Sequence, residues 1–379
     1  MRLRLIAALA CCMPAAGNAE ADAAPVRVSS HAMVHTCCTP PAMQESIFAE
    51  ARASGAEFIR VDIELGGIFT APEAAPDWRG LDRIIELARR HDLRVLGLIL
   101  SVPAYLSSCP ERGETAPLCP PTDPAEFGRL AGEVAAHAGG SIGHWEILNE
   151  PDADWAFKGT PEDYARMLSA SYESIKTRVP EAQVLMGGVE RPGEGRWIER
   201  MLATPGARAI RRFDIANIHA RGKLTDLPRY VRGWRARLAA HGFRGPLWVT
   251  EHGYPADPAV QRDPAHQSAD ASQASYLSLS VPTLARAGAR QVFVTLRDNL
   301  WGEYLSEGLV YIDVHQPHYP AARRVAFDAV RGLAGLGPAE PPPPPPAPVA
   351  PQEQPPPATL GGTLRALAEL IRGWALQGG

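Results

Sequence analysis

A strong charge of one sign, long apolar runs and nucleotide-binding motifs are all missing from this 379-residue chain. A formal net charge of −4 gives no basic footprint for nucleic acid, so no nucleic-acid partner is expected. Beyond the N-terminus, no apolar run approaches the roughly 20 residues that span a bilayer. No glycine-rich dinucleotide fingerprint follows the first apolar run, and no phosphate-binding lysine loop occurs, which argues against a nucleotide-binding enzyme.

Proline is in excess, and its position divides the chain. Twelve of the 37 prolines fall within Pro338–Pro357, whereas 45% of all residues are apolar, as in globular proteins. We therefore expect a globular body over residues 25–337, an extended proline-rich linker over 338–358 and a short tail over 359–379. Apolar residues at helical spacing predict an amphipathic helix in the tail, which docks on a partner, lies on a membrane surface or frays.

Residues 1–19 have the features of a signal peptide. Arg2 and Arg4 form a basic start, Leu5–Ala10 begins a short apolar core, and small residues at 17–19 suit a cleavage site. This pattern predicts export to the periplasm or the extracellular space. A lipoprotein signal at Cys11 and a cytosolic N-terminal helix are the alternatives.

Cysteine is scarce, and removal of the leader leaves Cys37, Cys38, Cys109 and Cys119. An even number in an exported chain favours disulfides, and four cysteines allow three connectivities. Cys109 and Cys119 bracket a short proline-rich stretch, as a loop staple does, whereas a bond between the adjacent Cys37 and Cys38 is uncommon. A zinc site is the alternative, although the spacing matches no standard zinc pattern.

Short apolar runs alternate with longer amphipathic segments between about residues 27 and 335. The eight strand candidates are Val28–His35, Glu57–Ile63, Arg94–Leu100, Ile142–Leu148, Gln183–Val189, Phe213–His219, Leu247–Thr250 and Gln291–Leu296. Helices are expected over Leu81–His91, Pro124–Ala138, Pro161–Arg178 and Ser268–Ala287. Nearly continuous apolar strands are typical of parallel sheets that are buried on both faces. The pattern predicts an α/β fold, a single (β/α)8 TIM barrel, with a doubly wound open sheet as the alternative.

Two of the predicted strands end in a glutamate. The fourth runs into Asn149-Glu150, and the seventh ends in Glu251-His252. Function in such barrels lies where the strands end. A carboxylate is costly to bury, so each glutamate needs a cation, hydrogen bonds or a catalytic role. Two carboxyl groups can share the work of cleaving a glycosidic bond. One protonates the leaving oxygen while the other attacks the sugar carbon.

The surrounding motifs carry a resemblance to a known superfamily. Trp-Glu-Ile-Leu-Asn-Glu-Pro at 145–151 and Trp-Val-Thr-Glu-His-Gly-Tyr at 248–254 resemble the paired signatures of clan A, the retaining glycoside hydrolases with a (β/α)8 barrel. Within the clan the likeness is greatest to family 39, which includes β-xylosidases and bacterial exopolysaccharide glycosidases. Segments 292–298 and 307–310 look like that family's eighth strand and following turn. The resemblance covers residues 28–335 and is specific as a pair of motifs.

The resemblance implies a role for each matching residue. Glu150 is expected to be the general acid/base with a raised pKa, and Glu251 the ionised nucleophile. Asn149 is expected to contact the sugar 2-hydroxyl, Arg60 to pair with the nucleophile, and His219 to lie near the same site. A retaining enzyme should hold its two carboxyl groups about 5–5.5 Å apart.

Other strand ends supply further candidates for substrate binding. Tyr254 and Trp301 fall in loops after strands and offer flat rings on which sugars stack. His35 and Asp298 end the first and eighth strands. Both are therefore expected at the same edge of the barrel as the paired glutamates.

Some positions depart from the family pattern and weaken any transfer of substrate identity. The histidine–aromatic pair common after the sixth strand reads His219-Ala220-Arg221. Thr295 and His252 stand where the family often has aromatic residues. Arg221 and Arg297 could meet the carboxylates of an acidic polysaccharide.

Two other classes of function were weighed against the glycosidase. A barrel that binds polysaccharide without cleaving it, in an exopolysaccharide secretion assembly, fits the tail and the departures but has no need of both glutamates. A metal-dependent barrel hydrolase wants a His-x-His motif on the first strand, and His35 has no such partner in the sequence. We therefore expect an exported retaining glycoside hydrolase that acts on a poly- or oligosaccharide, with no cofactor and no metal.

Overall fold

A computed structural model describes residues 27–190, 196–256, 269–298, 306–312 and 320–340 of the chain. The predicted signal peptide, most of the predicted linker, the predicted tail and Trp301 lie outside these residues. Within the described ranges, no helix is both long enough and apolar enough to cross a membrane.

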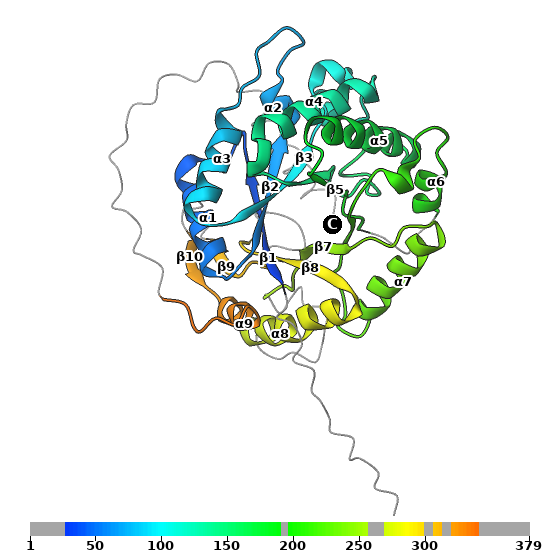
Figure 1. Ribbon diagram of the computed structural model, residues 1–379. Helices are drawn as coiled ribbons and strands as arrows, with labels where there is room; N and C mark the ends of the chain where they lie inside the picture. The colour runs from blue at the N-terminus through cyan, green and yellow to red at the C-terminus, as the bar shows by residue number, and fades with distance from the viewer. Residues whose placement is uncertain (1–26, 191–195, 257–268, 299–305, 313–319, 341–379) are drawn as a thin grey trace, which may run out of the picture.

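Parallel strands form the centre of the molecule, with helices around them (Figure 1). The strands are β1 (Val28–His35), β2 (Phe58–Glu64), β3 (Arg94–Leu100), β4 (His144–Ile147), β5 (Gln183–Met186), β6 (Ala216–His219), β7 (Leu247–His252) and β8 (Ala289–Thr295). They form one eight-stranded sheet in the order β5-β4-β3-β2-β1-β8-β7-β6. Parallel bridges from Leu185 to Ile215 and from Val189 to Ile218 link the two ends of this sheet. The predicted (β/α)8 barrel is confirmed, and the open sheet is excluded.

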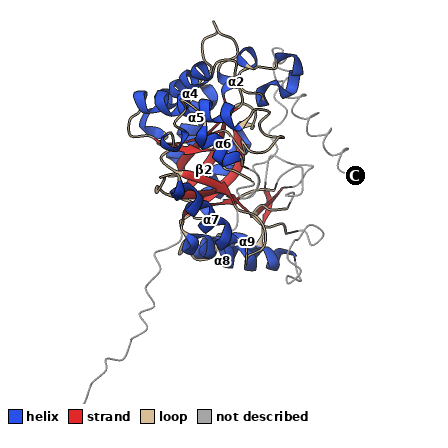
Figure 2. Cartoon of the chain, turned by 90° about the vertical axis from the view of Figure 1, so that its right-hand side faces the viewer, coloured by secondary structure: helices blue, strands red, loops and turns tan. Residues whose placement is uncertain are grey.

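Helices cover the outside of the strands (Figure 2). They are α1 (Pro41–Ala53), α2 (Leu65–Ile68), α3 (Arg79–Arg90), α4 (Pro124–Ala138), α5 (Pro161–Arg178), α6 (Trp197–Ala203), α7 (Leu227–Ala240), α8 (Ala269–Ala287) and α9 (Val325–Leu333). Side-chain caps begin two of them: Asp123 accepts from the backbone N–H of Ala125, and Thr160 forms a capping box with Asp163. A short antiparallel pair, β9 (Val310–Ile312) and β10 (Pro320–Arg323), was not predicted from the sequence.

The interior of the barrel changes from apolar to polar along the strands. Its apolar part is a buried cluster of Phe58, Leu96, Leu185, Ile215, Trp248 and Phe293. Alternate residues of a strand share one face, so Arg60 follows Phe58 on the inner face of β2, nearer the carboxyl end. This polar end is where the predicted site residues lie. Trp145 on β4 is fully buried.

The four cysteines of the described residues form two disulfides. Cys37 bonds to Cys38 in the loop after β1, and Cys109 bonds to Cys119 in the loop after β3. The second bond spans the short helical turn Pro110–Leu118, as expected of a loop staple. Because the sulfurs are bonded in pairs, the zinc alternative does not apply to them.

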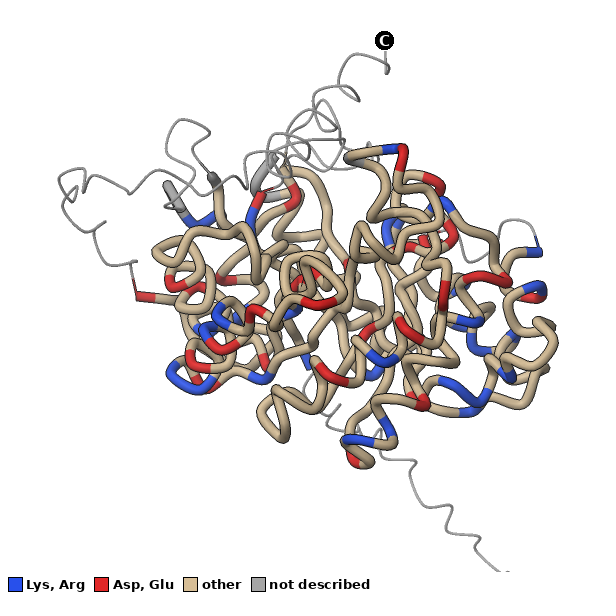
Figure 3. The backbone as a smooth tube through the Cα atoms, turned by 90° about the horizontal axis from the view of Figure 1, so that it is seen from above, with Lys and Arg blue, Asp and Glu red and all other residues tan. Residues whose placement is uncertain are grey.

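Basic and acidic residues are interspersed along the described backbone (Figure 3). Many form ion pairs on the surface, such as Arg129 with Glu126 and Arg200 with Glu162. Exposed pairs of this kind contribute little to stability, because solvent and salt screen them.

Candidate active site

Three side chains from different strands meet at the carboxyl end of the barrel. One oxygen of Glu150, one oxygen of Glu251 and one ring nitrogen of His219 all lie within 4.8 Å of one another. Glu150 follows β4, Glu251 lies in β7 and His219 ends β6, so the barrel itself brings them together. All three are buried, with exposed fractions of 3%, 7% and 4% in that order.

The backbone around Glu150 adopts an unusual conformation. Leu148 has φ of 62° and Glu150 has φ of 40°, both in the left-handed region. Such conformations cost a non-glycine residue about 1–3 kcal/mol each and cluster at functional sites. Two left-handed residues in one turn direct the chain sharply after β4 and leave the Glu150 side chain beside His219.

Arg60 links several parts of the site. It donates from Nη1 to Oε1 of Glu251 at 2.7 Å. It also holds Glu146 side-on, from Nε at 2.8 Å and from Nη2 at 2.9 Å. A further bond runs from Nη2 to Oδ1 of Asn149 at 2.8 Å. One fully buried guanidinium therefore fixes two carboxylates and one amide, which compensates its own burial cost.

A second guanidinium contacts Glu251 from the other side. Arg221 donates from Nη2 to Oε2 of Glu251 at 3.0 Å, and from Nε to both oxygens of Glu307 at 3.2 Å. The Thr295 hydroxyl donates to Glu307 at 3.3 Å. Both oxygens of Glu251 are thus held by arginines, and Glu307 holds Arg221 in place.

Two histidines complete the surroundings of Glu251. Nδ1 of His219 lies 2.5 Å from Oε1 of Glu150, and Nε2 of the same ring lies 3.5 Å from Oε1 of Glu251. His31 places Nε2 at 3.7 Å from that same oxygen and Nδ1 at 3.2 Å from Arg60. The His219 ring therefore bridges the two glutamates.

The two glutamates are shifted in opposite directions by their surroundings. Burial raises the pKa of Glu150 well above its ordinary value, and the negative charge of Glu251 adds to this rise. Burial alone also acts to raise the pKa of Glu251. Its neighbours His219, His31, Arg221 and Arg60 reverse that effect and hold its pKa well below the ordinary value. One carboxyl group is therefore kept protonated while the other is kept ionised.

His31 and His219 are neutral near pH 7. Burial lowers the pKa of His31 to about 3 and that of His219 to about 4. The two guanidiniums thus supply the lasting positive charge beside Glu251. With Glu150 protonated, its O–H can donate to Nδ1 of His219, which leaves the Nε2–H of that ring directed at Glu251.

Some buried polar atoms of the site have no hydrogen-bond partner among the described residues. They include Oε2 of Glu150 and Nε2 of His219. Buried polar atoms are almost always paired, and an unpaired one indicates a place that a ligand or water completes. The free oxygen of Glu150 is therefore the atom available to a ligand at this site.

The remaining predicted residues have other surroundings. The Tyr254 ring is 4% exposed and stacks on Tyr276 with centroids 4.2 Å apart, which is a core environment and not an open platform. His35 lies between Glu64 and Asp62. Asp298 accepts from Arg324 at 2.6 Å and from the backbone of Gly308 at 3.0 Å, so it also has a structural task. The partners of Asp298 belong to residues 306–312 and 320–340, whose position the sequence did not reveal.

Sequence reasoning missed several partners of the two glutamates. Glu146, His31 and Glu307 all belong to the network, and no role was predicted for any of them. Glu146 carried a signal, because a charged residue between Trp145 and Ile147 in an apolar strand needs a buried cation. For His31, the only signal in the sequence was its position within the first predicted strand.

The close approach of Glu150, His219 and Glu251 also suits the spacing of metal ligands. The charges around them do not suit a cation, because Arg60 and Arg221 already donate to both oxygens of Glu251. The donor set is therefore better matched to proton transfer and nucleophilic attack than to metal binding.

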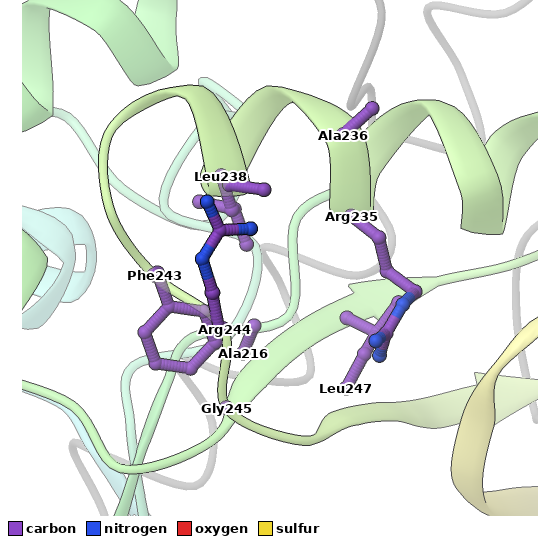
Figure 4. A pocket seen from close by; sticks show the side chains of 9 residues that line it. Ala216, Arg235, Ala236, Leu238, Phe243, Arg244, Gly245 and Leu247 are labelled. Carbon is purple, nitrogen blue, oxygen red and sulfur yellow. The ribbon is translucent and has the colours of Figure 1, made fainter.

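A separate cavity of about 340 Å³ lies at the opposite end of the barrel. Its lining includes Ala216 and Leu247, the first residues of β6 and β7, together with the end of α7 (Figure 4). The side chains of Arg235, Arg244 and Phe243 border it. Active sites of (β/α)8 barrels lie at the carboxyl ends of the strands, so this cavity is not part of the candidate site.

Comparisons with known proteins agree on the fold. No family model and no curated protein sequence matches the chain. A family 39 glycoside hydrolase from the gut symbiont Bacteroides cellulosilyticus WH2 is similar in structure, with a TM-score of 0.60 and 17% identity over 82% of this chain and 64% of its own. The family 39 enzyme from Xanthomonas axonopodis pv. citri gives a TM-score of 0.64 and 18% identity, over 84% of this chain and 69% of its own.

A third similar structure is a monomeric β-xylosidase from Caulobacter crescentus CB15. Its TM-score is 0.63 at 15% identity, and the match covers 83% of this chain and 70% of that one. The chain spans less than two thirds of the length of the Bacteroides protein. At these identities the likeness establishes the barrel, while the chemistry must come from the residues at its mouth.

Proposed function

We propose that this protein is an exported retaining glycoside hydrolase that cleaves O-glycosidic bonds of a poly- or oligosaccharide by double displacement. The main support is the pair Glu150 and Glu251, whose nearest oxygens lie within 4.8 Å and whose pKa values are shifted in opposite directions. Retaining glycosidases separate the two carboxyl groups by about 5–5.5 Å, whereas inverting enzymes use about 6.5–9.5 Å to admit a water. The short spacing favours direct attack by one carboxylate.

In the first step, Glu150 donates its proton to the leaving oxygen while a Glu251 oxygen attacks the anomeric carbon. The glycosidic C–O bond breaks, the leaving sugar departs as an alcohol, and an ester joins the remaining sugar to Glu251. In the second step the ionised Glu150 takes a proton from a water, which attacks the same carbon and releases Glu251. The first step matches the protonation states that the surroundings favour. In the ester Glu251 has lost the negative charge that helps to raise the pKa of Glu150, so Glu150 can act as a base in the second step.

Arg60 prepares Asn149 for contact with the sugar. Because Oδ1 of Asn149 accepts from Arg60, the amide NH2 of Asn149 points away from the guanidinium and is free to donate. A hydrogen bond from that group to the sugar 2-hydroxyl strengthens as charge develops in the transition state. Arg60 therefore acts on both the nucleophile and the sugar-binding amide.

Export is proposed from the leader at residues 1–19 and is supported by the disulfides Cys37–Cys38 and Cys109–Cys119. Disulfides persist in oxidising compartments and are rare in the reducing cytosol. A mature chain in the periplasm or outside the cell meets polysaccharides directly.

The proposal is tested by incubating the mature protein with a panel of polysaccharides and analysing the products by mass spectrometry. Oligosaccharide ladders indicate endo cleavage, and single sugars indicate exo cleavage. The Glu251→Gln variant should lose activity at least about 10³-fold, because the neutral amide cannot form the ester intermediate. Glu86→Gln on the exposed face of α3 is the matched control and should behave as wild type.

Two results would overturn the proposal. One is a Glu251→Gln variant that cleaves at the wild-type rate. The other is binding of a polysaccharide by the wild-type protein with no product formed, which would favour the non-catalytic barrel of a secretion assembly.

A further inference from the structure

Arg297 occupies a distinctive place at the end of β8. Alternate residues of a strand share one face, so Phe293 and Thr295 both lie on the inner face of β8, which ends at Thr295. Arg297 lies two residues beyond, in a parallel bridge with Val310. Phe293 belongs to the apolar interior cluster, and Thr295 donates to Glu307, the partner of Arg221. Arg297 therefore lies just past the carboxyl end of β8, the end of the barrel that carries the candidate site, beside Met43 of α1 and near His35.

The guanidinium of Arg297 lacks the partners that a buried cation needs. Its Nη1 contacts Sδ of Met43 at 2.8 Å, and a thioether is only a weak acceptor. Its Nε is buried without a hydrogen-bond partner among the described residues, which also offer no acceptor to Nη2. Burial lowers the pKa of Arg297 to about 10. Arg60 and Arg221 differ sharply, because each of them holds two carboxylates.

The groups around Arg297 do not neutralise it. His35 is a second cation: burial lowers its pKa, but Glu64 and Asp62 outweigh burial and raise it to about 9. The charge of Arg297 acts against that rise, so the two cations lie near each other. Asp298 attracts Arg297 but is itself bonded to Arg324.

We propose that Arg297 binds the carboxylate of a uronic acid residue, so that the glycan substrate is acidic. The free Nε–Nη2 edge is the edge that meets a carboxylate side-on with two parallel hydrogen bonds. Arg60 holds Glu146 through the same two atoms in this protein. This inference rests on the proposed glycosidase function, since it assigns the substrate class of that site.

The experiment uses acidic polysaccharides and their carboxyl-reduced forms, which keep every linkage and differ only in charge. Suitable acidic polysaccharides are polygalacturonate, alginate, glucuronoxylan and hyaluronan, each compared with its own carboxyl-reduced form. The wild-type kcat/KM should be about 10- to 100-fold higher on the acidic member of the pair that is cleaved, the range expected of a charged, bidentate contact. Arg297→Met should reduce this acidic-to-neutral ratio at least about 10-fold, and Arg297→Lys should retain part of it.

Controls separate substrate recognition from folding. Arg89→Met, on the exposed face of α3, should keep the wild-type ratio. Thermal unfolding of Arg297→Met checks that the barrel is intact. Inhibition of the wild-type enzyme by free glucuronate against free glucose needs no variant, and glucuronate should inhibit at about 10-fold lower concentration.

The two proposals fail in different ways. Cleavage of reduced and acidic glycans at equal rates, or stronger cleavage of a sulfated glycan than of its carboxylated counterpart, overturns the assignment of Arg297 and leaves the glycosidase standing. If the wild type cleaves no glycan, binding of acidic and carboxyl-reduced glycans to the Glu251→Gln variant is measured by calorimetry. A preference for acidic glycans that Arg297→Met abolishes, with no cleavage by the wild type, supports the assignment and overturns the glycosidase. Absence of both binding and cleavage overturns the assignment.

Discussion

Arg221 donates to Oε2 of Glu251 at 3.0 Å, on the carboxylate oxygen opposite the one that Arg60 holds. Arg221 also donates from Nε to both oxygens of Glu307. This ion pair holds the Arg221 guanidinium in place beside Glu251. Two cations on one carboxylate favour its ionised form strongly. Glu251, the proposed nucleophile, is therefore stabilised as an anion by guanidiniums from two different parts of the barrel.

Removal of Arg221 should raise the pKa of Glu251. The double variant Arg221→Met with Glu307→Gln avoids leaving Glu307 charged and buried, and it should move the acidic limb of the kcat/KM profile upward by about 1–2 pH units. Glu307→Gln alone, which keeps the arginine, is the comparison. An acidic limb at the wild-type position in the double variant would show that Arg221 does not tune Glu251.

The wild-type pH profile should be bell-shaped. Activity needs Glu251 ionised, so it is lost as pH falls through a pKa held below 4.5. Activity also needs Glu150 protonated, so it is lost as pH rises through a pKa raised well above 4.5. With an aryl glycoside whose leaving group needs no proton, Glu150→Gln should remove the basic limb and keep the acidic one. A basic limb that survives in this variant would assign the acid to another group.

Arg60 should matter for stability as well as for activity. Arg60→Met leaves the buried carboxylates Glu146 and Glu251 without their shared cation, and such losses cost about 3–5 kcal/mol of unfolding free energy. Urea denaturation at pH 7 measures the change. Arg89→Met breaks an exposed pair with Glu86 and should leave the urea midpoint close to that of the wild type. Similar losses in the two variants would contradict the structural role of Arg60.

The absence of a side chain at Gly188 allows the His219 ring to pack directly against the backbone of that residue. A Cβ built at Gly188 would lie 2.2 Å from Nε2 of His219, so Gly188→Ala must displace the ring that bridges Glu150 and Glu251. We expect kcat/KM to fall about 10- to 100-fold, as misplacement of a group near the chemistry does. Gly143→Ala, just before β4, meets no neighbour within 4 Å and should keep wild-type activity. Equal activity in the two variants would remove His219 from the account.

Much of the fold was predictable, because local signals marked it. The bounds of β1 and β3 matched, and so did those of α4 and α5, where caps and proline at the first turn define the start. Predicted strand 6 was too long, since pairing in β6 begins only at Ala216. The β9–β10 pair was missed because its strands are very short.

The candidate site was predictable only in part. Glu150 and Glu251 were found because each stands in a recognisable motif at a strand end. The contacts of Arg221 with Glu251 and Glu307 join segments far apart in the chain, and no local pattern encodes such a pairing. The burial of Tyr254 against Tyr276 likewise depends on how α8 packs on the barrel.

The anomeric configuration of the first product tests the central claim most directly. Proton NMR recorded during cleavage of a glycan by the wild-type protein distinguishes the configuration formed at the enzyme from that formed later by mutarotation. The nearest oxygens of Glu150 and Glu251 lie within 4.8 Å of each other, which predicts that the first sugar released has the configuration of the bond that was cleaved. A first product of inverted configuration would contradict attack by Glu251 and the double displacement built on it.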